Sequence, residues 1–139
     1  MEVKVKKVHK DAKLPTYATD GSGCFDFYTV DKGMVGVIDH IFDTGLQMEI
    51  PKGYALFIFS RSGHGFNQKI RLSNCVGVID SDYRGNIKIN LISDRGAISF
   101  KTGDRIAQGC ILPVPHVTFQ GVDDLSETDR GQGGFGSTG

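Results

Sequence analysis

The hydrophobic positions along this chain have the spacing of β-strands. Val3 and Val5 alternate with polar residues, residues 54–59 form an unbroken apolar run, and residues 87–91 alternate again. No window of eleven or more residues carries a convincing repeat of 3.6 residues. The pattern therefore predicts short strands and no long amphipathic helix.

Further short apolar runs are separated by Gly, Pro, Asp, Asn and Ser, the residues that turns favour. These runs lie at residues 47–50, 70–72, 75–79, 97–100 and 105–112. Many short strands in a chain of 139 residues predict one all-β domain, a sandwich, jelly roll or barrel. We assign this domain to residues 1–129 and a glycine-rich tail to residues 130–139, with no internal repeat and no linker between domains.

The tail carries five of the nineteen glycines of the chain, and two interpretations of it are open. Its composition alone is typical of a solvated, mobile terminus. Arg130 and Phe135, however, offer a guanidinium for phosphate oxygens and a flat ring for a base. Glycine N–H groups and the hydroxyls of Ser137 and Thr138 can converge on an anion. The second interpretation is a lid that closes over a nucleotide.

The charge balance disfavours some classes of partner. Sixteen Lys and Arg equal sixteen Asp and Glu, so no net attraction holds a nucleic acid or an anionic membrane. No apolar run has the length of a signal peptide or a membrane span, so we expect a soluble, cytoplasmic protein. Three scattered cysteines, at 24, 75 and 110, fit reduced, buried small side chains, and no His/Cys spacing indicates zinc.

Two polar positions early in the chain are candidates for binding. The sequence Ser-Arg-Ser-Gly at residues 60–63 follows the apolar run directly, and it forms either an exposed turn or a phosphate cradle around Arg61. Asp26 lies among aromatic residues, so its carboxylate needs a partner. That partner is either a cation such as Arg61, in a structural ion pair, or a metal.

The stretch at residues 74–87 is the most informative part of the sequence. An apolar run places Asp80 at its end, where a carboxylate can hold a water in a partly desolvated cleft. Asp80 and Asp82 could equally cap their own backbone in a turn, which is the commoner use of Asp. The turn leads into the alternating residues 87–91, which predicts a hairpin.

A third polar stretch covers residues 103–108 and is predicted to be a turn that enters a strand. We expect Asp104 and Arg105 to form a structural ion pair. Gln108 could donate its amide to a phosphate.

Five segments in a fixed order resemble the five motifs of the trimeric deoxyuridine triphosphatases (dUTPases). They are GSGCFDF at 21–27, SRSG at 60–63, GVIDSDYRG at 77–85, GDRIAQ at 103–108 and RGQGGFGSTG at 130–139. The resemblance extends from about residue 14 to the last residue. The third and fifth motifs are specific on their own, whereas the second and fourth count mainly through their order.

This resemblance implies a jelly-roll-like β-barrel that forms a homotrimer by exchanging C-terminal arms, with active sites at the subunit interfaces. It implies hydrolysis of dUTP to dUMP and pyrophosphate with Mg²⁺. Such an activity lowers the dUTP concentration, limits uracil in DNA and supplies dUMP for dTMP synthesis.

The resemblance also implies roles for individual residues. Asp80 would orient and deprotonate the water that attacks the α-phosphorus, and Tyr83 would pack under the deoxyribose and exclude a ribose 2′-hydroxyl. Asp26 would bind the metal through water. The remaining residues would bind substrate: Asn74, Val78, Ile79 and Lys88 at the uracil edge, Arg61, Ser62, Gly63 and Gln108 at the phosphates, and Arg130, Phe135, Gly136, Ser137 and Thr138 as a lid from a neighbouring subunit.

The chain departs from the usual motif sequences of the family at three places. Gly23 and Cys24 stand where Ala-Gly is more usual, with Phe27 in place of a frequent Leu. Ser60 replaces a frequent Pro, and residues 64–65, His-Gly, replace an apolar-small pair. None of these changes removes a residue to which the resemblance gives a chemical role.

Two other functions compete with dUTP hydrolysis. A dCTP deaminase of the same fold needs a further acid or base at the pyrimidine amino group, and the sequence offers no obvious Glu near the predicted hairpin. A non-catalytic β-module that binds a protein partner in the cleft is the other alternative. The presence of Asp80 and of the complete tail favours the hydrolase.

Overall fold

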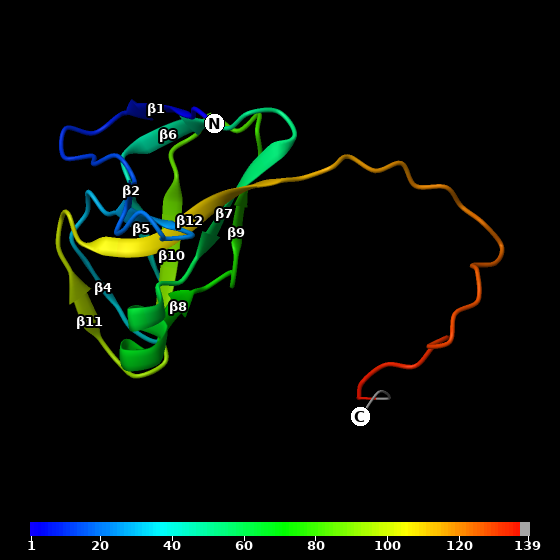
Figure 1. Ribbon diagram of the computed structural model, residues 1–139. Coiled ribbons are helices and arrows are strands. Elements are labelled where there is room, and N and C mark those ends of the chain that lie inside the picture. The colour runs from blue at the N-terminus through cyan, green and yellow to red at the C-terminus, as the bar shows by residue number, and fades with distance from the viewer. Residues whose placement is uncertain (137–139) are drawn as a thin grey trace.

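The computed structural model describes residues 1–136, which fold into short strands and one π-helical turn (Figure 1). The elements are β1 (Lys4–Lys7), β2 (Thr16–Tyr17), β3 (Phe25–Tyr28), β4 (Gly33–Val35), β5 (His40–Asp43), β6 (Leu46–Glu49), β7 (Tyr54–Phe59), η1 (His64–Gln68), β8 (Ile70–Leu72), β9 (Gly77–Ile79), β10 (Lys88–Ser93), β11 (Ile98–Phe100) and β12 (Arg105–Pro113). The prediction of an all-β chain is confirmed. Over residues 1–136 we find no helix long and apolar enough to cross a membrane.

The strands pair antiparallel in four small sheets that curve around one core. The largest has the order β2-β3-β12-β7-β9, and a second has the order β5-β10-β8. The pairs β1-β6 and β4-β11 close the remaining sides (Figure 1). Strands far apart in the sequence are neighbours in these sheets, which is the connectivity of a jelly-roll-like barrel.

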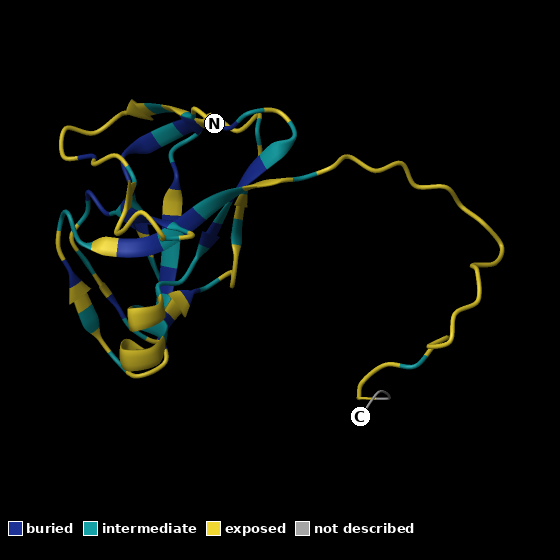
Figure 2. Cartoon of the chain, viewed as in Figure 1, coloured by how far each residue is buried: buried dark blue, intermediate teal, exposed yellow. Residues whose placement is uncertain are grey.

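The core is filled by the inward-facing residues of the strands (Figure 2). In β10 the buried residues alternate with more exposed ones, because successive side chains of a strand point to opposite faces. Phe27, Phe42, Leu56 and Ile89 are almost completely buried, and each contributes about 1.5–3 kcal/mol of transfer free energy. This core fixes the positions of the strand ends that carry the polar motifs.

The outer face of the five-stranded sheet combines polar and apolar residues. Residues paired across antiparallel strands share a face, and Gln108 is paired with both Asp26 and Phe59. Phe57 is paired with Val78 on that same face. Both phenylalanines are only partly buried, and Val78 is 52% exposed. One side of this face is therefore polar, and the other is an uncovered apolar surface.

Three predictions about the elements are corrected by the structure. The hairpin expected at residues 74–91 is wrong, because β9 pairs with β7 whereas β10 pairs with β5 and β8. Strands β2, β4 and β5 were not predicted, since they are short and lack a clear alternation. The cysteines are free, but they are not all buried, because Cys75 is exposed.

After β12 the chain leaves the barrel. The backbone N–H of Val114 still donates to the carbonyl of Gly53 at 2.8 Å, and the following residues are almost all exposed (Figure 2). Residues 114–136 form no strand and extend away from the body (Figure 1). The predicted division at residue 129 stays a prediction, since the last strand already ends at Pro113.

Candidate active site

Asp26 and two arginines form an ion-pair cluster on the outer face of the five-stranded sheet. The Nε of Arg61 donates to Oδ1 of Asp26 at 3.1 Å, and Nη1 of Arg105 donates to Oδ2 at 3.2 Å. The cluster lines a hollow of about 370 Å³ together with Cys24 and Gln108. Two cations and one anion leave a positive charge beside an amide, a combination that suits phosphate oxygens.

The ion pair between Asp26 and Arg61, one of the two alternatives for this carboxylate, is present. The pair predicted between Asp104 and Arg105 is wrong. Arg105 reaches across to Asp26, and Oδ2 of Asp104 instead accepts from the backbone N–H of Lys101 at 2.9 Å. The Asp104 side chain therefore closes its own turn before β12.

Backbone and side-chain hydrogen bonds fix the turn at residues 60–65. The Oγ of Ser60 accepts from the backbone N–H of Leu72 at 2.9 Å, and the N–H of Gly65 donates to the carbonyl of Arg61 at 3.0 Å. Ser62 and Gly63 are exposed at the tip of this turn. The Ser62 hydroxyl is thus accessible to a ligand beside Arg61.

The burial of Cys24 in the same hollow affects its chemistry. Burial raises the pKa of the Cys24 thiol, and the neighbouring thiol of Cys110 and the charge of Asp26 raise it further. The thiol therefore stays protonated at neutral pH and serves as a small neutral wall of the hollow.

A second hollow, of about 140 Å³, lies between β9 and β10. It contains all four residues predicted to read a uracil edge, and its lining is Ile58, Leu72, Asn74, Gly77, Val78, Ile79, Lys88, Ile89 and Asn90. Because β9 is the edge strand of its sheet, one row of its backbone N–H and C=O groups faces this hollow. The two strands predicted to form a hairpin are splayed apart here, and the space between them suits a flat, polar ring.

The loop between β9 and β10 presents Tyr83. Its backbone N–H donates to the carbonyl of Asp80 at 3.2 Å, and its hydroxyl donates to the carbonyl of Asn86, also at 3.2 Å. A Cβ added at Gly85 would lie 2.3 Å from the Tyr83 hydroxyl oxygen, so only glycine lets the ring lie this close. The ring is 45% exposed and offers a flat wall to a ligand.

Asp80 does not line the hollow between β9 and β10. It follows β9 and lines a larger, neighbouring hollow of about 640 Å³ with Tyr54, Arg84 and His116. Asp80 is exposed in the single chain, and its carboxylate is free to bind solvent.

The Asp26 cluster and Asp80 lie far apart within one chain. Across the sheet, three strand spacings separate β3, which carries Asp26, from β9. Along the strands, Asp26 is level with Phe59 of β7, whereas the register places Asp80 beside Ala55, four residues further along β7. With about 4.8 Å per strand spacing and about 3.3 Å per residue, the two carboxyl-bearing positions lie roughly 20 Å apart. The phosphorus atoms of a triphosphate are joined by single bridging oxygens, so one triphosphate cannot contact both places in the same chain.

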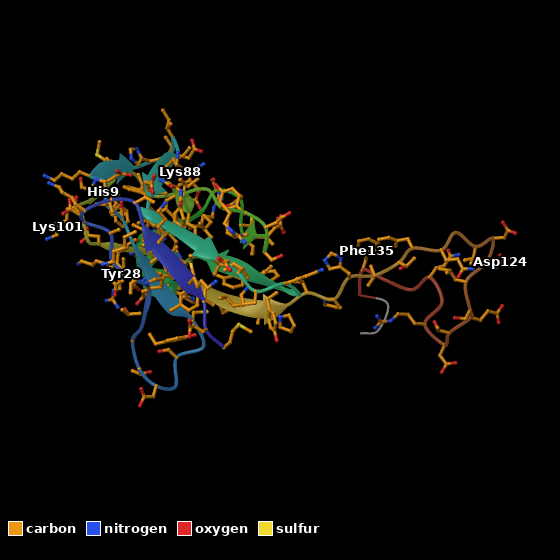
Figure 3. All side chains as sticks on the ribbon, turned by 90° about the horizontal axis from the view of Figure 1, so that it is seen from above. His9, Tyr28, Lys88, Lys101, Asp124 and Phe135 are labelled. Carbon is orange, nitrogen blue, oxygen red and sulfur yellow. The ribbon has the colours of Figure 1, made fainter. Side chains whose placement is uncertain are left out.

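The predicted lid residues are also remote from these hollows in the single chain. Arg130, Phe135 and Gly136 are exposed on the extended tail, and Figure 3 shows Phe135 well away from Lys88 on the barrel. Gly136 has φ +93°, a conformation that favours glycine. Ser137 and Thr138 lie outside the described residues.

Comparison with known proteins shows the family. The model of the dUTPase family matches residues 10–139. The chain belongs to the dUTPase family. A deoxyuridine 5′-triphosphate nucleotidohydrolase of Nautilia profundicola is 41% identical to it, over 100% of this chain and 99% of the relative. The family predicted from the five motifs, that of the dUTP diphosphatases, is therefore confirmed.

Solved dUTPase structures share the fold. The dUTPase of Staphylococcus bacteriophage 80alpha, solved with dUPNHPP, superimposes with a TM-score of 0.91 at 24% identity, over 99% of this chain and 98% of that one. A mutant dUTPase from phage phi11 of S. aureus, whose structure describes a structural Mg(II) ion, has a TM-score of 0.82 at 20% identity, over 90% and 99% of the two chains. At such identities the likeness establishes the fold alone.

Two residues of this dUTPase site were not predicted. Arg105 completes the Asp26 cluster. The sequence signal was its cationic side chain three residues before Gln108, but the adjacent Asp104 offered a nearer partner. His64 contacts Arg61, with Nη1 of Arg61 donating to Nε2 of His64 at 3.1 Å. The only sequence signal for His64 was its departure from the usual dUTPase pattern.

The residues near Asp26 fit Mg²⁺ through water better than by direct coordination. Both carboxylate oxygens of Asp26 already accept from guanidinium groups. Nowhere in residues 1–136 do three or more His, Cys, Asp or Glu side chains gather closely enough to hold a metal. Because Mg²⁺ keeps several waters and favours phosphate oxygens, such an ion would bind chiefly to a triphosphate, with Asp26 contacting its waters.

Proposed function

We propose that this dUTPase hydrolyses dUTP to dUMP and pyrophosphate with Mg²⁺, at sites shared between the subunits of a homotrimer. The single observation that carries this proposal is the separation of roughly 20 Å between the Asp26 cluster and Asp80. A second chain that brings its Asp80 and its β9–β10 hollow beside the Asp26 cluster of the first would complete the site. A heterologous contact that closes after three subunits forms such a site three times.

Two features of the single chain support this assembly. Phe57, Phe59 and Val78 form an incompletely buried surface on the outer face of the five-stranded sheet, next to the Asp26 cluster. Such surfaces on soluble proteins commonly mark interfaces. The exposed tail after β12 has the reach to lie along a neighbouring subunit, which we propose it does as an exchanged C-terminal arm. Its last ten residues would act as the lid.

Base selection would follow from the hollow between β9 and β10. Asn74 and backbone groups near Val78, Ile79 and Lys88 would hydrogen-bond the uracil edge. A methyl group is worth only about 1–3 kcal/mol of discrimination in a pocket, so exclusion of thymine requires a narrow space with rigid walls. Tyr83, held over Gly85, would pack against the deoxyribose and leave no room for a 2′-hydroxyl.

The cations would hold the phosphates and oppose the charge that moves onto pyrophosphate in the transition state. Arg61, Ser62, Gly63 and Gln108 of one subunit would contact phosphate oxygens. Arg130, Phe135, Gly136, Ser137 and Thr138 of another subunit would close over the nucleotide. Closure excludes water and strengthens each of these electrostatic interactions.

Asp80 would supply the general base. Its carboxylate would accept a hydrogen bond from a water, orient it toward the α-phosphorus and take its proton as the new P–O bond forms. The bond from the α-phosphorus to the bridging oxygen then breaks, and pyrophosphate leaves. Bound Mg²⁺ would supply additional positive charge at the phosphate oxygens. The reaction lowers dUTP, which limits uracil in DNA, and yields dUMP for dTMP synthesis.

Pyrophosphate release from dUTP in the presence of Mg²⁺ tests this proposal. We expect release from dUTP and much slower release from dTTP, dCTP and UTP at the same concentration. The absence of pyrophosphate from dUTP would refute the proposal, and ammonia release from dCTP would indicate a deaminase instead.

A further inference from the structure

Two partners hold the guanidinium of Arg61, one at each end. Its Nε donates to Oδ1 of Asp26, and its Nη1 donates to Nε2 of His64, both at 3.1 Å. Only Nη2 is left without a partner among the hydrogen bonds of the described residues. The Arg61 side chain is 21% exposed, so this free end borders the hollow where we place the phosphates.

This contact defines the tautomer of His64. A guanidinium has no acceptor, so Nε2 of His64 accepts with its lone pair, and the proton of the neutral ring lies on Nδ1. The Nδ1 atom is buried and has no hydrogen-bond partner in residues 1–136. The His64 ring therefore gains its one polar contact from Arg61.

Surrounding groups keep the His64 ring neutral and fixed. Its pKa is lowered from 6.5, first by burial, then by the charges of Arg61 and Arg105, while Asp26 and Asp104 act in the opposite direction. The ring packs edge-on against Phe100, with the centroids 5.5 Å apart. At neutral pH His64 is thus an acceptor in a fixed position.

We propose that His64 is a positioning residue which, together with Asp26, fixes the Arg61 guanidinium so that its free end faces the substrate phosphates. The inference rests on the proposed function, because it assigns a task to the same phosphate site. A guanidinium that is already immobilised loses less conformational entropy when it binds a phosphate. Loss of His64 is therefore expected to weaken substrate binding more than it slows the chemical step.

The pH dependence of this contact has a defined sign. Protonation of His64 removes the acceptor at Nε2 and places a third positive charge beside Arg61 and Arg105. The folded protein resists this protonation until the pH falls below 6.5, the ordinary pKa of histidine. The contact is therefore complete above pH 6.5 and is lost as the pH falls through the lower pKa of the folded state.

The test compares the full-length wild type with His64→Gln and His64→Leu in steady-state kinetics with dUTP and Mg²⁺ from pH 5 to 8.5. Gln retains an acceptor that does not titrate, whereas Leu has none. At pH 7.5 we expect KM to rise about tenfold in His64→Leu, with kcat within about twofold, and to stay close to wild type in His64→Gln. Below pH 6.5 the ratio of the wild-type KM to the His64→Gln KM should rise. This ratio cancels the titration of the substrate phosphates, which both proteins share.

An unchanged KM in His64→Leu, or a ratio that stays flat or falls in acid, would overturn the positioning role. A falling ratio would mean that protonated His64 binds a phosphate itself. If the wild type does not hydrolyse dUTP, the proposed function fails. The same three proteins titrated with inorganic tripolyphosphate then test the positioning role separately, with a dissociation constant about tenfold higher expected for His64→Leu alone.

Discussion

Among single residues, Asp80 has the central role in the proposed reaction, because its carboxylate is the general base. Replacing Asp80 with Asn keeps the size of the side chain and removes the base. We expect Asp80→Asn to bind the non-hydrolysable analogue dUPNHPP nearly as well as the wild type. Its kcat should fall by about 10²–10⁴-fold, the usual contribution of a general base. Turnover and analogue binding are measured on the same preparation.

Asp82 provides a matched control for this substitution. It is an exposed aspartate in the same loop, two residues from Asp80, and it lines the same hollow. Asp82→Asn should retain kcat within about twofold, because nothing assigns its carboxylate a role in the reaction. An Asp80→Asn enzyme with unchanged kcat would remove Asp80 from the mechanism.

At this scale, the contacts of a side chain could be predicted where its chemistry left few options. Because the Asp26 carboxylate lies among aromatic residues, it needs a partner, and Arg61 was correctly predicted as a candidate. Arg105 was assigned to Asp104, its neighbour in sequence, because pairing across the sheet depends on the register of β3 and β12. That register is a property of the folded sheet and cannot be read from either segment alone.

At the scale of the elements, the loop between β9 and β10 is shaped by the contact of Tyr83 with Gly85. A methyl group at residue 85 would overlap the Tyr83 hydroxyl and ring, so the ring must move in Gly85→Ala. We expect the selectivity for dUTP over UTP, measured as the ratio of kcat/KM values, to fall about tenfold or more. In this variant the displaced Tyr83 ring would no longer exclude a ribose 2′-hydroxyl.

Gly36→Ala serves as the control for that substitution. A Cβ at Gly36 meets nothing within 4 Å, and this glycine lies in the turn between β4 and β5. Its selectivity should match the wild type. Retention of full discrimination against UTP in Gly85→Ala would show that Tyr83 does not exclude the ribose.

The strands themselves were only partly predictable. Strands β7 and β8 begin and end where the apolar runs do, since alternation and burial directly determine them. The partners of β9 and β10 were not predictable, because each of these strands pairs with a strand that is distant in the sequence. The error in the hairpin prediction matters for function, because the space between these two strands is where we place the base.

At the scale of the whole molecule, the all-β class and the dUTPase family followed from the sequence, whereas the geometry of the site did not. Motif order identified the family because five spaced segments rarely coincide by chance. The distance between the Asp26 cluster and Asp80 emerges only from strand order and register. It is this distance that makes one chain insufficient and leads to the shared site.

Complementation between two inactive variants tests the shared site most directly. Asp80→Asn and Arg61→Gln each damage a different half of the site, and the two chains are unfolded together and refolded as a mixture. If Arg61 and Asp80 of one site come from different subunits, random assembly restores about a quarter of the sites to wild-type composition. We predict that pyrophosphate release from dUTP returns to about a quarter of the wild-type rate, while either variant refolded alone stays inactive. A mixture no more active than the separate variants would contradict a site shared between subunits.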